Sequence, residues 1–327
     1  MDTFITFAQD WYGLSLLLGI ATLIAGGHFL VEGSVAIAKR LNVSMLVIGL
    51  TIVAFSTSSP ELAFNIITSY GGHGELCLGN IFGSNIANIG LVLGIGALIC
   101  KLPVTGRVVK TEFPWLVAAT LLVGLVAGFG ILNVAWAIAF LCIFVLLMWS
   151  WFRIGKGGES KVAEQSGDVI PDTDCSAITA WAMLIGGLVL LGLGGKATEI
   201  GAVTGALQFG MSEMLVGSTI VAIATSLPEV VTTIVAARKG HPDLAVGNVV
   251  GSNIFNILFV LPITIFVHPI TPPEDVWVYV VVMIAMTFLA YLLTRDNKIK
   301  PYEGGILVGL FACYLIGITI WTLSNSN

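Results

Sequence analysis

Residues 49–62 read GLTIVAFSTSSPEL, and residues 217–230 read GSTIVAIATSLPEV. The same shift of 168 positions lays GGHGELCLGNIFGSNIANIGLVL (71–93) on KGHPDLAVGNVVGSNIFNILFVL (239–261). Without a gap, 23 of the 45 positions from 49 to 93 are identical to their counterparts. The chain therefore contains an internal duplication, and two apolar parts of it carry the same polar residues.

The duplicated segments belong to a chain that is too apolar for a water-exposed surface. Of its 327 residues, 57% are hydrophobic and 10% are charged, and the mean hydropathy is +0.98. A soluble domain carries about 25% charged residues, so this composition indicates that lipid surrounds most of the chain. The net charge of -5 includes no basic block for nucleic acid, and the five cysteines show no metal-ligand spacing.

Apolar segments of about 20 residues, the length that crosses a bilayer, occur ten times along the chain. They are residues 11–37, 44–71, 76–99, 113–130, 134–152, 177–197, 212–237, 244–267, 276–294 and 303–323. The expected fold class is all-α, a polytopic membrane protein of ten transmembrane helices. The expected domains are a first five-helix repeat (1–152), a cytoplasmic linker (153–176) and a second five-helix repeat (177–327). Because five is odd, the two repeats must be inverted in the membrane.

The basic residues predict the orientation of these spans. Thirteen of the fourteen Lys and Arg residues fall in connections on one side, and Lys196 is the exception. The positive-inside rule assigns that side to the cytoplasm, which leaves both termini outside. Asp2 and Asp10 lie where a cleavable signal peptide would be basic, so the first apolar segment is expected to remain as a span.

Each copy of the duplication places a Pro-Glu pair inside a span, at Pro60-Glu61 and at Pro228-Glu229. An ionised carboxylate there costs roughly 2.5–3.5 kcal/mol on insertion scales, so two at matching places indicate a compensating cation. The alternative is a pair of protonated glutamates in structural hydrogen bonds. Each proline also displaces a backbone carbonyl, which in a bilayer must line a cavity or bind a ligand. For the prolines alone, a simple kink is the alternative.

Hydroxyl and amide side chains accompany the two glutamates in both copies. In each copy, the GSNI motif places a serine and an asparagine four positions apart, on one helix face. Asn85 and Asn253 lie one step round the helix and are expected to hold neighbouring helices together. The candidate site residues are Thr57, Ser58, Ser84, Asn88, Thr225, Ser226, Ser252 and Asn256.

All these candidate ligands offer oxygen, which favours hard cations such as Na⁺, Ca²⁺ and Mg²⁺. Two carboxylates balance one divalent charge. Ca²⁺ accepts about 6–8 oxygens in flexible geometry, whereas Mg²⁺ requires a regular octahedron, so broken helices suit calcium better.

The pattern GxTxxAxxTSxPE followed by GNxxGSNIxN, present twice and inverted, resembles the alpha repeats of the cation/Ca²⁺ exchanger superfamily. The resemblance is strongest to the prokaryotic sodium/calcium exchanger branch. It implies ion sites formed by the second, third, seventh and eighth spans, and sliding of the first and sixth. It also implies a divalent site made by Glu61, Glu229 and the carbonyls of Thr57 and Thr225. The implied sodium sites add Ala54, Ser58, Ser84, Ala222, Ser226 and Ser252.

One position departs from the family pattern. Asn256 stands where characterised members carry Asp, so the site has one potential carboxylate fewer. The resemblance implies antiport of Ca²⁺ against Na⁺ by alternating access, and Ca²⁺/H⁺ exchange through the same glutamates is the alternative. An inverted duplication within one chain argues against a passive channel.

The resemblance also predicts the setting in which the chain works. No enzyme activity is expected, because no span carries a nucleophile with its base or an HExxH motif. The transported Ca²⁺ and Na⁺ would bind as substrates without a cofactor. The expected partners are these ions and the lipid of a prokaryotic inner membrane, and the chain is expected to function as a monomer.

Overall fold

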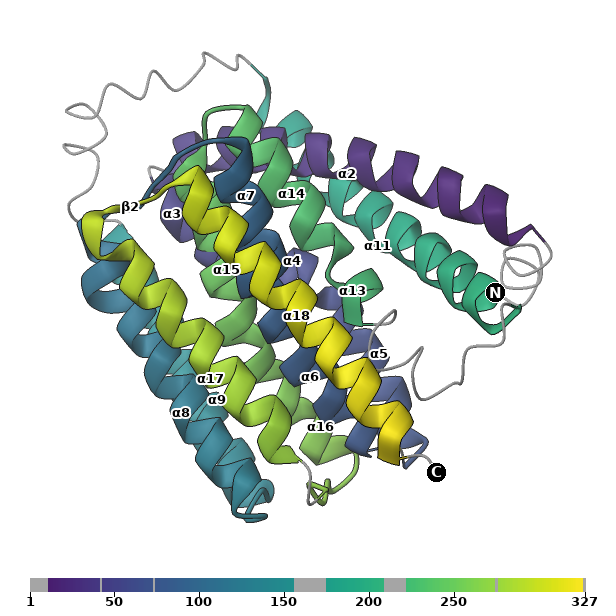
Figure 1. Cartoon of the computed structure of the whole chain (residues 1–327). Helices are drawn as coiled ribbons and strands as arrows, with labels where there is room; N and C mark the ends of the chain where they lie inside the picture. Colours follow the sequence, from purple (N-terminus) through teal and green to yellow (C-terminus); the bar gives the residue numbers. More distant parts are fainter. Residues whose placement is uncertain are drawn as a thin grey trace.

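A computed structural model describes residues 11–41, 43–72, 74–155, 175–208, 222–273 and 276–325. The described residues are mainly helices packed side by side (Figure 1). The first half contains α2 (Tyr12–Leu41), α3 (Met45–Ile48), η1 (Gly49–Val53), α4 (Ala54–Thr57), α5 (Ser59–Tyr70), α6 (Gly74–Ala87), η2 (Asn88–Leu93), α7 (Gly94–Ile99), β1 (Leu102–Pro103), η3 (Val108–Glu112), α8 (Phe113–Gly128) and α9 (Val134–Gly155).

The second half contains related elements in a partly different order. It contains α11 (Ala177–Gln208), α13 (Ala222–Thr225), α14 (Leu227–Arg238), α15 (Pro242–Phe255), η5 (Asn256–Val260), α16 (Leu261–Val267), α17 (Val276–Leu293), η6 (Thr294–Asp296), β2 (Lys298–Ile299) and α18 (Pro301–Asn325). The segments η1, η2, η3 and η5 are π-helical, and η6 is a 3₁₀ turn.

Nine of the predicted spans have counterparts in the described residues. Eight helices are long and apolar enough to cross a bilayer, and the bent pair Met45–Thr57 with Ser59–Tyr70 is a ninth candidate. The predicted span 212–237 lies partly outside the described residues, which contain only α13 and α14 of it. Ten helices in two inverted repeats therefore stay a prediction. Most of the predicted linker also lies outside the described residues, and α9 extends to Gly155.

The fourth span begins earlier than its sequence predicted. The helix starts with η3 rather than at residue 113, so it includes Glu112, which is fully buried. Arg107 Nε donates to one carboxylate oxygen of Glu112 at 2.8 Å, and Trp151 Nε1 donates to the other at 2.7 Å. These two charge-assisted hydrogen bonds make a carboxylate tolerable inside the helix bundle.

α2 and α11 lie antiparallel against each other at the side of the molecule (Figure 1). Glycines let their backbones touch: a Cβ on Gly26 would lie 2.8 Å from the backbone nitrogen of Leu191, and one on Gly194 would lie 2.8 Å from that of Leu23. Small residues allow this close approach in membranes. The glycines recur every seven positions, at 19, 26 and 33 in α2 and at 187, 194 and 201 in α11. The duplication shift of 168 relates the two sets.

A short antiparallel pair connects the two halves at one end of the bundle. In it, Leu102 of β1 pairs with Ile299 of β2, and Pro103 pairs with Lys298. The strands tie the connection before α8 to the connection before α18. No prediction from the sequence anticipated this pairing, because the partners are almost 200 positions apart.

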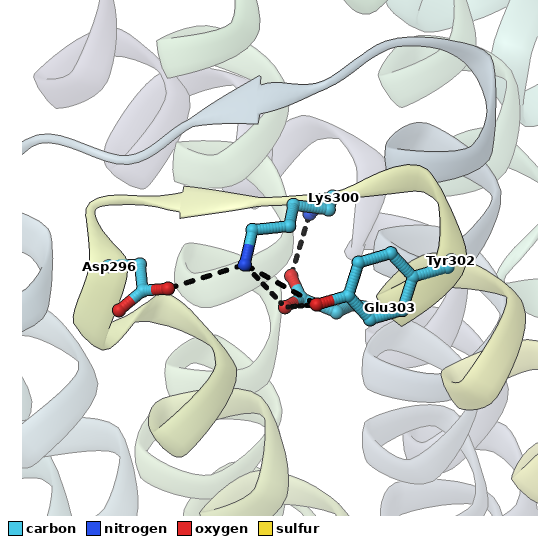
Figure 2. A network of polar contacts seen from close by, with 4 residues as sticks. All are labelled: Asp296, Lys300, Tyr302 and Glu303. Atoms are coloured by element: carbon cyan, nitrogen blue, oxygen red, sulfur yellow. Dashed lines mark hydrogen bonds and ion pairs between the residues drawn. The ribbon is translucent and has the colours of Figure 1, made fainter.

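Beside β2, a polar network holds the start of α18 (Figure 2). Lys300 Nζ donates to Asp296 at 3.3 Å, to the Tyr302 hydroxyl at 3.3 Å and to Glu303 at 3.4 Å. The pKa of Lys300 is raised above its ordinary value, first by the hydrogen bond to Tyr302, then by the one to Asp296 and by the negative charge of Glu303. The Glu303 carboxylate also accepts the Lys300 backbone N–H at 2.7 Å, which is the acidic half of a capping box.

Candidate functional site

Two helices are broken at matching places, just before the two glutamates. Ser58 alone separates α4 from α5, and Ser226 alone separates α13 from α14. Their backbone angles (φ −84°, ψ 4° and φ −85°, ψ 1°) fall outside the regular helix. Pro60 and Pro228 follow in the first turn of the new helices, where a missing N–H costs nothing. The predicted breaks near both prolines are therefore confirmed.

Glu229 is completely buried, and its carboxylate contacts both halves of the chain. Its Oε1 atom accepts a hydrogen bond from Ser58, across the two halves, at 3.1 Å. The same oxygen accepts one from Ser252, within its own half, at 3.3 Å. Within the described residues, the Oε2 atom has no hydrogen-bond partner. This carboxylate therefore keeps one oxygen available to a ligand.

Glu61 occupies the matching place in the first half and is 1% exposed. The hydroxyl groups of Thr225 and Ser226, from the other half, face its carboxylate without reaching hydrogen-bonding geometry. In the described residues, neither carboxylate oxygen has a hydrogen-bond partner. Glu61 and Glu229 are also close enough to repel each other electrostatically. The two broken helices thus bring two buried carboxylates together from opposite halves.

Further predicted site residues are buried without hydrogen-bond partners in the described part of the chain. In native proteins about 90% or more of buried polar groups are paired, so a concentration of unpaired ones requires an explanation. Here they belong to the two repeated motifs that the sequence singled out. The unpaired atoms are Ser84 Oγ, Ser226 Oγ, and both amide atoms of Asn88 and Asn256. Their oxygens can serve as ligands for a cation.

Thr57 lies between the two halves. Its hydroxyl donates to Asn248 Oδ1 at 3.1 Å and lies 3.3 Å from Ser252 Oγ. The Ala54 carbonyl, a predicted sodium ligand, accepts a longer contact of 3.4 Å from the same hydroxyl.

Thr225, in the second half, contacts Asn80 of the first half, as Thr57 of the first half contacts Asn248 of the second. It accepts a hydrogen bond from Asn80 Nδ2 at 3.3 Å and donates to the Ala222 carbonyl at 3.3 Å. All twelve predicted site residues therefore lie on the broken helices α4–α5 and α13–α14 or on the buried helices between them, α6–η2 and α15–η5.

Asn88 and Asn256 each begin a π-helical segment, η2 and η5. Such segments often mark functional sites, because the widened turn re-aims side chains and backbone groups. The symmetric placement strengthens the case that these two asparagines face the site. No feature of the local sequence had indicated a π-helix here.

Asn80 and Asn248, which form hydrogen bonds with the two threonines, were not among the residues predicted from the sequence. The sequence could have indicated them, because each lies four positions before the serine and eight before the asparagine of the GSNI motif, on the same helix face. Asn85 and Asn253 differ from expectation. Their amides donate to carbonyls of their own helices, at 2.7 Å and 3.1 Å, and in the part of the chain that the structure describes they donate to no neighbouring helix.

The chain is similar to known proteins along most of its length. The profile of the family described as sodium/calcium exchanger protein matches residues 11–153 and 179–320. The sodium/calcium exchanger MaX1 of Methanosarcina acetivorans is 30% identical over 341 residues, covering 93% of this chain and 97% of MaX1. CaxA of Alkalimonas amylolytica is 36% identical over 307 residues, covering 91% of this chain and 96% of CaxA.

A solved structure of the sodium-calcium exchanger NCX_Mj matches the fold. The TM-score is 0.82 at 28% sequence identity, and the match covers 94% of this chain and 99% of that chain. With the two buried glutamates on broken helices, these similarities identify a membrane antiporter for Ca²⁺ and another cation. The chain belongs to the sodium/calcium exchanger family, in the prokaryotic branch of the cation/Ca²⁺ exchanger superfamily.

Proposed function

We propose that the chain exchanges Ca²⁺ for Na⁺ by alternating access, at a buried site whose charge comes from Glu61 and Glu229. The observation that carries this proposal is the meeting of two buried carboxylates whose oxygens are largely unused by the protein. An uncompensated buried ion costs several kcal/mol, so the pair requires a cation or protons. One Ca²⁺ neutralises both carboxylates.

The neutral oxygens distinguish the two candidates for the counter-ion. Protons need only the carboxylates, whereas Na⁺ also needs several uncharged oxygens around it. Ser84, Ser226, Asn88 and Asn256 offer buried oxygens that no protein group uses in the described residues. We therefore favour Na⁺ over H⁺. MaX1 and NCX_Mj, which this chain resembles, are both named as sodium/calcium exchangers.

Each site residue takes a role in this proposal. Glu61 and Glu229 carry the charge and bind Ca²⁺ together with the carbonyls of Thr57 and Thr225. The neutral ligands for Na⁺ and the remaining positions of the coordination shell come from Ala54, Ser58, Ser84, Asn88, Ala222, Ser226, Ser252 and Asn256. Ca²⁺ tolerates such a mixed set of carboxylate, carbonyl, hydroxyl and amide oxygens.

Flux measurements on purified protein in liposomes test the counter-ion. Vesicles loaded with Na⁺ and diluted into sodium-free buffer with radioactive Ca²⁺ should accumulate calcium. Vesicles with an acidic interior and no Na⁺ should not. Calcium uptake driven by the proton gradient alone, with no effect of Na⁺, would replace this proposal with Ca²⁺/H⁺ exchange.

We also propose the full architecture: ten spans in two inverted repeats, working as a monomer in a prokaryotic inner membrane. Both termini lie outside the cell in this arrangement, and the α9–α11 connection lies in the cytoplasm. The antiparallel packing of α2 against α11, which the duplication relates, supports inversion. In a cysteine-free background, Lys101→Cys, in the exposed connection before the fourth span, should resist a membrane-impermeant thiol reagent in intact cells, and Ser324→Cys should react.

A further inference from the structure

The two threonines at the helix breaks are related by the duplication but are hydrogen-bonded with opposite polarity. Thr57 donates its hydroxyl proton to the amide of Asn248, whereas Thr225 accepts a proton from the amide of Asn80. The difference can be traced to one position at which the two copies differ, which is Asn65 in the first and Thr233 in the second.

In the first copy, backbone chemistry determines how the amides point. Asn65 Nδ2 lies 2.8 Å from the Glu61 carbonyl, which can only accept, so this atom must be the nitrogen. Its second hydrogen reaches Asn80 Oδ1 at 2.7 Å. The Asn80 nitrogen therefore points to Thr225 at 3.3 Å, and the Thr225 proton goes to the Ala222 carbonyl.

In the second copy, the amide points the other way. Asn248 Nδ2 donates to the Thr233 hydroxyl at 3.2 Å and approaches the Glu229 carbonyl at 3.5 Å, where only a donor fits. Asn248 Oδ1 therefore faces Thr57 at 3.1 Å, and Thr57 must supply the proton.

This polarity decides how many lone pairs each threonine can offer to a cation. A hydroxyl that donates to an amide oxygen keeps both lone pairs, whereas one that accepts from an amide nitrogen has one of them occupied. The Ser252 hydroxyl, 3.3 Å from Thr57, also has an acceptor for its proton in Glu229. Two oxygens that bind Ca²⁺ at 2.3–2.6 Å and at right angles lie roughly 3.3–3.7 Å apart. The Thr57–Ser252 spacing fits such a pair.

We propose that Asn80 and Asn248 are positioning residues, and that Asn65 and Thr233 set the direction of their amides. The hydroxyl oxygen of each threonine would then act beside the carbonyl proposed above. The Thr57 hydroxyl consequently offers the cation a better oxygen than the Thr225 hydroxyl does, and the two ends of the site bind cations with different strength. This inference rests on the proposed cation site, and it adds a source of asymmetry that the twelve predicted ligands do not contain.

Exchanging the two residues tests the proposal. Asn65→Thr makes the first copy resemble the second, frees the Asn80 amide to turn, and lets Thr225 donate. Thr233→Asn does the reverse and makes Thr57 an acceptor. Calcium titrations on purified full-length protein in sodium-free buffer should show tighter binding for Asn65→Thr and weaker binding for Thr233→Asn. Each shift should be about three- to tenfold, the effect of one hydrogen bond.

The double variant is the matched control, because it reverses both amides and again leaves one donating and one accepting threonine. Its calcium affinity should lie within about twofold of the wild type. Structural damage would weaken binding in both single variants and would not be repaired in the double one, so that result would overturn the proposal. A wild-type protein that binds no Ca²⁺ would instead refute the proposed function.

Discussion

At the scale of single residues, charge and unused hydrogen-bonding capacity coincide. Glu61 and Glu229 are both buried and come from opposite halves, and Ser58 of the first half donates to the Glu229 carboxylate at 3.1 Å. The remaining carboxylate oxygens are unpaired there. Buried carboxylates without hydrogen-bond partners raise the free energy of a helix bundle that holds no ion, and a bound cation removes this cost.

Replacing either glutamate by glutamine should therefore remove calcium exchange. Glu61→Gln or Glu229→Gln takes away half of the charge that balances Ca²⁺, and we expect flux to fall by roughly 100-fold or more, since several kcal/mol of ion stabilisation are lost. Flux in liposomes measures this, with thermal stability of the purified protein as the check on folding. Glu75→Gln, at the exposed start of α6, is the matched control and should behave as wild type. A Glu61→Gln protein with wild-type flux would contradict the proposed site.

At the scale of helices, α2 and α11 form a pair held by backbone contact. The pair also has a polar link to the rest of the molecule, because Glu32 of α2 forms an ion pair with Lys239, after α14, at 2.7 Å. His28 lies 3.2 Å from the same carboxylate oxygen. The sequence had suggested no role for Glu32. The contact between the two long helices depends on the glycines that repeat every seven residues.

One added methyl group in this contact should destabilise the protein. A Cβ on Gly194 would lie 2.8 Å from the backbone nitrogen of Leu23 and 2.8 Å from the carbonyl oxygen of Gly19, and neither backbone can move alone. Overpacking of this kind costs about 1–3 kcal/mol. The melting temperature of Gly194→Ala in detergent should fall by several degrees.

Gly192→Ala is the control for this substitution, in the same helix and two positions away. A Cβ on Gly192 meets nothing within 4 Å. The Gly192→Ala variant should be as stable as the wild type or slightly more stable, because alanine favours a helix over glycine by about 1 kcal/mol. Equal stability of the two variants would show that α2 and α11 do not touch as described.

At the scale of the whole molecule, the charge of the site limits how many ions it can carry. Of the twelve predicted site residues, only Glu61 and Glu229 are ionisable, so the site carries two negative charges. One Ca²⁺ or two Na⁺ leave it neutral, whereas three Na⁺ would leave one positive charge in a medium of low dielectric constant.

We therefore expect electroneutral exchange of two Na⁺ for one Ca²⁺. In liposomes, calcium uptake driven by an outward Na⁺ gradient should be the same at zero voltage and at a potassium diffusion potential of either sign. Uptake that rises severalfold when the interior is made negative would show that net charge moves with each cycle.

A substitution at Asn256 provides the matching test. Both amide atoms of Asn256 are buried and unpaired in the described residues, and the residue begins η5 beside the site. Asn256→Asp adds a third negative charge, so it should strengthen Ca²⁺ binding and make exchange sensitive to voltage, because a third Na⁺ can then be balanced. Calcium affinity and voltage dependence that both equal those of the wild type would mean that Asn256 does not face the ion.

The sequence by itself determined the repeat, nine spans of the described residues and the two helix breaks, and it singled out the two buried glutamates. These features follow from local properties: the thickness of a bilayer sets the length of an apolar run, and a proline acts on its own helix turn. Pro60 and Pro228 therefore marked the breaks correctly, and Glu61 and Glu229 could be recognised as costly without knowledge of their neighbours.

Only the tertiary structure decided the features that depend on partners far apart in the chain. Glu112 enters a helix because Trp151, 39 positions away, donates to it. The amide of Asn248 points as it does because Thr233 and Thr57 meet it from two different helices. Hydrogen bonds of this kind have direction, and that direction is set by which groups the fold brings within about 3 Å, a distance that no local pattern contains.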